Sequence, residues 1–334
     1  MLISQIFHGG CGGCETPRPA SGLSALLDVI LPVFLVIGFG YVAVRAKLLA
    51  EPAVDGLMRF AQNFAVPCLL FRSIAFLDLS SAYDPGLMTS FYLGAFAGFF
   101  ACFFGAMLIF RRPMPDAVAI GFAGLFSNSL LLGLAITERA YGTAALQGNY
   151  AIISLHAPML YGFGIALMEW ARSRGGGLSG PALLGQIGRA VLSQSLVIGI
   201  LAGFAVNLAG NPLPGFFWSG VDMIARAAIP VALFGLGGVL VRYRIEGDIG
   251  PVLLVTFASL ILHPGVTWLL ATQVFQLDTA ALRSAVVTAA MAPGVNAYMF
   301  AHMYGVGKRV NASSVLVATA LSIVTAWGWL HLLP

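Results

Sequence analysis

Two short polar clusters stand out in this sequence because each lies in the middle of a long apolar stretch. Their members are Ser127, Asn128 and Ser129 in the first cluster, and Pro293, Gly294 and Asn296 in the second. Polar side chains are costly in an apolar interior unless they line a cavity or bond to protein. Proline, glycine and an amide side by side unwind a helix more than they bend it. The clusters therefore predict breaks in two helices, near Asn128 and near Asn296.

A broken helix can bind an anion where its second half begins. The first N–H groups of a helix have no acceptor within it and carry partial positive charge. Two such helix starts facing each other suit a carboxylate, and the side chains of Asn128 and Asn296 add amide donors. Such a site needs no lysine. The alternative is that each asparagine only bonds to backbone groups that the break has freed.

Other polar residues inside apolar stretches are weaker candidates for the same site. His156 either contacts a substrate or carries a proton, or else it bonds to a backbone carbonyl. Asn63 is predicted to line the cavity at the site, whereas His263 is predicted to be structural. Asp222 and Arg226 lie four residues apart on one helix, so we expect them to pair with each other.

The composition excludes several classes of protein. Of the 334 residues, 59% are apolar and only 9% are charged, and the mean hydropathy is +0.91. That is too little charge for a water-facing surface and too much apolar mass for a disordered chain. The formal net charge of +4 gives no reason to expect a nucleic-acid partner. The lipid bilayer is the predicted environment, with room for roughly ten spans of about 20 residues each.

Charged residues and loop prolines divide the chain into apolar runs. The runs cover residues 23–44, 54–76, 87–110, 116–137, 147–170, 183–208, 216–241, 252–275, 279–304 and 312–333. They are twice as long as the strands of a membrane barrel and do not alternate in polarity, so they predict an all-α membrane protein with ten transmembrane helices. We number each loop by the run that precedes it. The odd-numbered loops hold 11 of the 17 Lys and Arg residues. The positive-inside rule therefore places these loops in the cytoplasm and both termini outside.

The two halves of the sequence also resemble each other. Three features of the first half recur in the second: residues 35–38 as 196–199, Pro67 as Pro230, and Asn128 as Asn296. Because each half holds five helices, an odd number, the second half must enter the membrane from the opposite side, which makes an inverted repeat. The predicted organisation is a first repeat over 23–170, a cytoplasmic linker over 171–182 and a second repeat over 183–334.

The N-terminal tail, residues 1–22, is predicted to be disordered or to precede the true start of the protein. It holds a C-G-G-C motif formed by Cys11 and Cys14. A zinc site needs four ligands, and only His8 is available as a third. No metal site and no cofactor are therefore predicted.

Taken together, these motifs resemble the auxin efflux carrier family, which includes bacterial malonate-type transporters. The similar segments are residues 31–41, 59–73, 228–235 and 292–305. The resemblance implies a five-plus-five inverted repeat in which broken helices four and nine cross at mid-membrane. It also implies a scaffold of helices one, two, six and seven, through which related carriers often form homodimers, and a transport domain of the other helices. One departure is Ala135, which stands where similar carriers often have a proline.

The resulting hypothesis is an inner-membrane secondary transporter for a small organic anion, such as a mono- or dicarboxylate. The alternative with the same fold is a sodium-coupled symporter of the bile-acid type, but Asn128 and Asn296 have no acidic companion in the sequence. A membrane-embedded enzyme is disfavoured because its common catalytic motifs are missing. Transport is predicted to be independent of sodium, with any proton dependence passing through His156.

Overall fold

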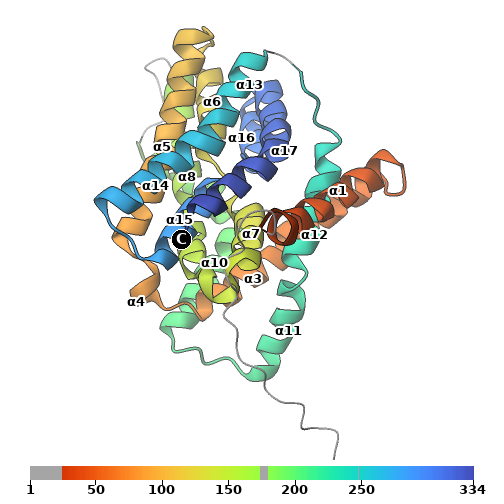
Figure 1. The fold of residues 1–334 in the computed structure, drawn as a ribbon, viewed down its shortest axis with the longest axis vertical. Coiled ribbons are helices and arrows are strands. Elements are labelled where there is room, and N and C mark those ends of the chain that lie inside the picture. Colours follow the sequence, from red (N-terminus) through yellow and green to blue (C-terminus); the bar gives the residue numbers. More distant parts are fainter. Residues whose placement is uncertain (1–24, 174–179, 247) are drawn as a thin grey trace, which may run out of the picture.

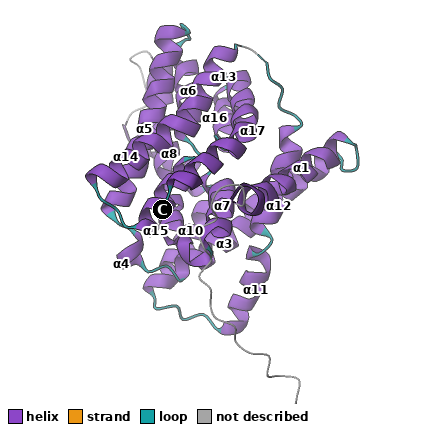
Figure 2. Cartoon of the chain, viewed as in Figure 1, coloured by secondary structure: helices purple, strands orange, loops and turns teal. Residues whose placement is uncertain are grey.

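The computed structural model describes residues 25–173, 180–246 and 248–334. The tail with its two cysteines and residues 174–179, half of the expected linker, lie outside the described residues. The described residues form helices joined by loops (Figure 2). Extended pairing within them is limited to a single bridge between Ser127 and Pro293.

Helical segments cover the five apolar runs of the first half. They are η1 (Ala25–Ile30) with α1 (Leu31–Arg45); α2 (Glu51–Phe60), η2 (Ala61–Ala65) and α3 (Val66–Ala75); α4 (Leu79–Ala82), α5 (Pro85–Phe104) and η3 (Gly105–Ile109); α6 (Met114–Leu125), η4 (Ser129–Gly133) and α7 (Leu134–Tyr141); and η5 (Thr143–Leu146) with α8 (Gln147–Ser173). Local sequence explains where α5 begins. The Asp84 side chain accepts a hydrogen bond from the Leu87 N–H at 2.8 Å, and Pro85 occupies the first helical position.

The second half is also helical throughout its runs. Its segments are α9 (Gly180–Leu192) and α10 (Ser195–Leu208); α11 (Gly215–Ala225) and α12 (Ala228–Leu240); α13 (Ile249–Phe257), η6 (Ala258–Leu262), α14 (His263–Leu269) and η7 (Leu270–Val274); α15 (Thr279–Ala289) and α16 (Val295–Tyr304); and α17 (Lys308–Leu332). Figure 1 shows how they are arranged.

Six helical stretches of the described chain are long and apolar enough to cross a membrane. They are Leu26–Arg45, Pro85–Ile109, Thr143–Ser173, Gly215–Leu240, Ile249–Val274 and Lys308–Leu332. The pair α9 and α10 passes the same criterion together, but it is bent by 84°. The predicted all-helical membrane fold is confirmed at this level.

The prediction of one helix over 183–208 is wrong. The helix stops at Leu192, and Ser193 and Gln194 form a bend that we call the elbow. The Ser193 Oγ and the Gln194 Nε2 both donate to the Ala190 carbonyl oxygen, at 3.2 and 3.4 Å. These side chains satisfy a carbonyl at the end of α9, which lets the chain turn before α10 begins.

Three π-helical segments each precede a proline by two residues. Pro32, Pro67 and Pro264 follow the ends of η1, η2 and η6 in this way. A proline inside a helix lacks an N–H donor and its ring clashes with the preceding turn. The wider π turn accommodates the proline without ending the helix, so these prolines fall within continuous helical segments.

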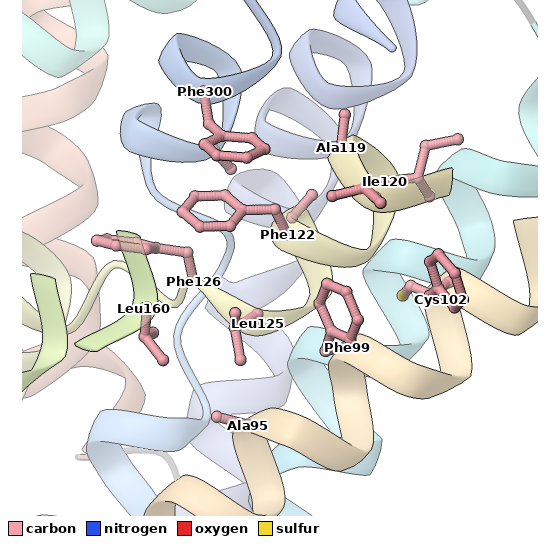
Figure 3. Packing of buried hydrophobic residues seen from close by; sticks show 14 of the residues in the cluster. Ala95, Phe99, Cys102, Ala119, Ile120, Phe122, Leu125, Phe126, Leu160 and Phe300 are labelled. Atoms are coloured by element: carbon pink, nitrogen blue, oxygen red, sulfur yellow. The ribbon is translucent and has the colours of Figure 1, made fainter. Parts of the chain in front are cut away.

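The helices group into two bundles. In one, α1 packs on α12, and α3 packs on α10 and α11; in the other, α5 packs on α6 and α14, α8 on α6, and α17 on α13 and α16. Figure 3 shows the rings of Phe122 and Phe300 lying against each other in the core of the second bundle, in a cluster that also contains Phe99. The rings of Phe122 and Phe300 stack with centroids 4.0 Å apart, which joins α6 to α16.

Glycines set the contact between α1 and α12. A Cβ atom at Gly40 would overlap the Phe234 carbonyl oxygen, and a Cβ at Gly237 would overlap that of Ile37. Small residues allow this backbone approach, which is a common basis of helix association in membranes.

We expect Gly40→Ala to lower the thermal stability of the purified protein, because overpacking costs about 1–3 kcal/mol. Gly38→Ala is the matched control on the same helix, since nothing lies within 4 Å of a Cβ there, and alanine is the better helix former. Melting curves in detergent that fall equally for both variants, or for neither, would contradict this close packing.

Candidate functional site

The two predicted helix breaks are confirmed, and they lie against each other. One break separates α6 from η4, and the other separates α15 from α16. The Asn128 N–H donates to the Ala292 carbonyl oxygen at 2.8 Å, and the Gly294 N–H donates to the Phe126 carbonyl oxygen at 3.0 Å. Each break therefore satisfies backbone groups that the other leaves free. We call this pair of breaks the crossover.

Two helix starts flank the crossover. Helix η4 begins at Ser129, and the N–H groups of Leu132 and Gly133 both bond to the Asn128 carbonyl oxygen. Helix α16 begins at Val295, and the Ala297 N–H bonds to the Gly294 carbonyl oxygen. The N–H groups before these have no acceptor within their own helix. They carry the partial positive charge of a helix N-terminus.

A cavity of about 760 Å³ opens beside the crossover. Six of the eight predicted site residues line it: Asn63, Ser127, Asn128, His156, Gly294 and Asn296. The other two, Ser129 and Pro293, lie behind this surface. The Ser129 hydroxyl lies 2.7 Å from that of Ser127, and Pro293 is the bridge partner of Ser127. These two residues shape the crossover and do not line the cavity.

His156 enters the cavity wall from α8. Its side chain is only 4% exposed. Neither ring nitrogen makes a hydrogen bond within 3.5 Å among the described residues, and the ring interacts only more loosely with the backbone of Ser127. The ring packs edge-on against Phe126, with centroids 4.6 Å apart. An unsatisfied buried polar group is costly, so this imidazole has hydrogen-bonding capacity available to a ligand. His263 instead lies 3.2 Å from the Phe91 carbonyl oxygen through its Nε2 and does not line the cavity.

The cavity surface carries no formal charge from fixed ions. No Lys, Arg, Asp or Glu is among the described residues that line it. The described chain also holds no group of three His, Cys, Asp or Glu residues placed to bind a metal. The polar part of the wall therefore consists of amides, hydroxyls, imidazoles and helix N-termini, which is a donor-rich surface suited to an anion.

A buried polar network supports the crossover. The Asn149 Nδ2 donates to the hydroxyls of Thr137 and Thr288, at 3.1 and 2.7 Å. All three side chains are fully buried, and they join α8 to α7 and α15. Because α7 follows one break and α15 precedes the other, the network holds the two broken segments in fixed relation.

The expected Asp222–Arg226 pair is wrong. Asp222 on α11 forms its ion pair with Arg72 on α3. A spacing of four residues compares positions on one helix only. In the fold, α11 packs against α3, which brings Arg72 to Asp222. A charge pattern within one helix could not identify this partner.

Sequence reasoning missed several cavity residues. They are Gln62, Tyr161, Gln194, Ser195, Tyr298 and His302. The Tyr161 hydroxyl donates to the Asn296 carbonyl oxygen at 3.4 Å, so it supports the start of α16. Gln62 adjoins Asn63 and could have been found from it. Gln194 carries a signal as well, because Ser193, Gln194 and Ser195 are three adjacent polar residues within an apolar run, as Ser127, Asn128 and Ser129 are.

Comparison with known proteins gives matches over nearly the whole chain. The model of a family described as "Membrane transport protein" matches residues 25–175 and 182–330. A protein named "Putative malonate transporter" from Rhizobium meliloti (strain 1021) is 26% identical over 317 residues, which cover 93% of this chain and 97% of that protein. "Uncharacterized transporter YfdV" from Escherichia coli (strain K12) is 24% identical over 92% of this chain and 98% of its own length. "Lysosomal cholesterol signaling protein" from Mus musculus is 26% identical over 73% of this chain but only 30% of its own length.

Proposed function

The chain belongs to this membrane transport protein family, the auxin efflux carrier family that its motifs resemble, and from that premise we propose that it is a secondary transporter of a small organic anion. A multi-pass membrane transporter is the established part of this statement. The proposal of an anionic substrate rests on one observation. Two helix N-termini, Asn128 and Asn296 meet at one cavity, and no Lys, Arg, Asp or Glu is among the described residues that line it. The anion is a mono- or dicarboxylate bound at the crossover, and the name of the Rhizobium relative supports this class.

The proposed topology has ten spans in an inverted repeat, in the inner membrane. It adds four spans to the six long stretches: α2 with α3, α6 with α7, the bent pair α9 and α10, and α15 with α16. Breaks or charges explain why these four fall short as single apolar helices. The occurrence of one break in each half supports the repeat.

The proposed mechanism is a relative motion of the two bundles. The cavity is lined by η2, α10 and α12 of one bundle and by α8 and α16 of the other. An elevator-like or rocking displacement would expose the crossover to each side in turn while the carboxylate stays bound. By resemblance, the first bundle is the scaffold and the surface for a homodimer.

The topology predicts where each end of the chain lies. A reporter fused after Arg174 should read cytoplasmic, and one fused after Pro334 should read periplasmic, because basic residues concentrate in the odd-numbered loops. A cytoplasmic reading at Pro334 would rule out ten spans that start outside.

The crossover predicts the effect of removing its amides. Asn128→Ala or Asn296→Ala should weaken binding of the transported anion about tenfold to a hundredfold, since a hydrogen bond to a charged group contributes about 1.5–3 kcal/mol. Titration of the purified protein measures this loss. Asn207→Ala is the control, because Asn207 bonds to three carbonyls at the end of α3, outside the cavity. The Asn207→Ala variant should lose thermal stability and keep its affinity for the anion. Unchanged affinity in both Asn128→Ala and Asn296→Ala would mean that these two residues have only a structural role.

The last prediction from this site concerns coupling. Uptake into proteoliposomes should not depend on a sodium gradient, because no carboxylate is among the described residues that line the cavity. Any dependence on a proton gradient should be lost in His156→Gln, which keeps a polar side chain and removes the titratable ring. Sodium-driven accumulation would favour the alternative, a sodium-coupled symporter of the bile-acid type.

A further inference from the structure

The cavity has a second group of polar side chains that does not belong to the crossover. It comes from η2 and the elbow, on the α3–α10 side of the cavity. Its members are Gln62, Asn63, Ser193, Gln194 and Ser195. Apolar residues such as Met58, Val66 and Leu196 make up the rest of this side.

A hydrogen bond fixes which end of the Asn63 amide is available. The Ser195 Oγ donates to the Asn63 Oδ1 at 3.2 Å. The Asn63 oxygen is thereby engaged, and its two N–H donors remain for an acceptor in the cavity. Ser195 also begins α10, where the N–H groups of Val197 and Ile198 both bond to the Gln194 carbonyl oxygen. The earlier N–H groups of Ser195 and Leu196 have no acceptor within the helix.

The Gln194 side chain is held in the same way. Its Nε2 donates to the Ala190 carbonyl oxygen at 3.4 Å, which leaves the amide oxygen as an acceptor. This part of the wall thus offers donors from Asn63 and α10 beside an acceptor from Gln194. Such a mixed set fits an oxygen-bearing group that can both donate and accept hydrogen bonds. No Lys or Arg is among the described residues that line the cavity, so the group does not need a full negative charge to bind.

One carboxylate cannot use all of this capacity. An ionised carboxylate accepts about four hydrogen bonds. The N–H groups at the starts of η4 and α16, with the amides of Asn128 and Asn296, already meet that number. His156 is a further, independent sign of spare capacity, since it is 4% exposed, lines the same cavity and has only the loose interaction with the Ser127 backbone among the described residues.

We propose that Asn63, Gln194 and Ser195 form a second subsite, and that it takes the second oxygen-bearing group of a bifunctional organic acid whose first carboxylate binds at the crossover. The second group is a hydroxyl, a keto oxygen or a second carboxyl. The proposal rests on the proposed function, because it requires the carboxylate at the crossover. Asn63 is exposed and Gln194 and Ser195 are half-buried in the open cavity, so these groups are hydrated until a ligand displaces their water. The subsite then selects against acids of the same length that end in a methyl group, since these displace that water without replacing its hydrogen bonds.

The test compares acids matched in chain length. Malonate, succinate and glutarate are titrated against propionate, butyrate and valerate on the purified full chain, and the hydroxy acids 3-hydroxypropionate and 4-hydroxybutyrate and the oxo acid 4-oxobutyrate are titrated against butyrate, valerate and valerate in the same way. The ratio of affinities within each pair is the readout. We expect at least one of the bifunctional acids to bind about tenfold or more tightly than its partner. Asn63→Ala, Gln194→Met and Ser195→Ala should each reduce that ratio about three- to tenfold. Gln273→Met is the matched control, because Gln273 is exposed and lies outside the cavity.

Each result decides between the two proposals. Equal affinities within every pair, or a ratio unchanged in all three variants, would overturn the subsite. Asn296→Ala should weaken both members of a pair if the crossover holds the shared carboxylate. If Asn296→Ala changes neither affinity while Gln194→Met still lowers the ratio, the shared carboxylate does not bind at the crossover, and the subsite as proposed, which requires it there, fails as well. If Asn296→Ala weakens both members of a pair while the ratio is unchanged in all three subsite variants, only the subsite fails. If no acid of either series binds, both proposals fail.

Discussion

The fold around the cavity depends on satisfying backbone hydrogen bonds where water is absent. A helix that breaks inside a bilayer exposes N–H and C=O groups, each of which costs several kcal/mol if it stays unpaired. Here the two breaks avoid this cost by pairing with each other. The Asn128 N–H donates to the Ala292 carbonyl oxygen, and the Gly294 N–H donates to the Phe126 carbonyl oxygen. The first N–H groups of η4 and α16 keep no acceptor within their own helices, and residues at both helix starts line the cavity.

Rigid surroundings keep this arrangement in place. The Asn149 network joins α7, which follows the first break, to α15, which precedes the second. The stacked rings of Phe122 and Phe300 join α6, which precedes the first break, to α16, which follows the second. The second bundle therefore holds the crossover as one unit. On the opposing bundle, the glycine contacts between α1 and α12 allow equally close packing. The cavity lies where these two tightly packed bodies meet, which is where relative motion is least hindered by interlocked side chains.

The sequence predicted the parts of this structure that local chemistry dictates. Long apolar runs located the helices, and the polar clusters located the breaks, because proline, glycine and asparagine act on their own segment. The sequence could not predict which residues from distant segments become neighbours in the fold. Arg72 lies far from Asp222 in sequence, and the elbow at Ser193 and Gln194 lies in an apolar run with no proline to mark it. Missed cavity residues such as His302 became visible only once the packing of α16 placed them.

The uncharged cavity wall has an electrical consequence. With its histidines neutral, the empty site carries no net charge, so a membrane potential does little work on the unloaded protein as it changes conformation. With the proposed anion bound, the site would carry the charge of that anion. A potential of 100 mV does about 2.3 kcal/mol of work on each elementary charge that crosses the membrane. A carrier of the proposed kind would therefore be electrogenic on its loaded step, and an interior-negative potential would favour outward movement of the bound carboxylate.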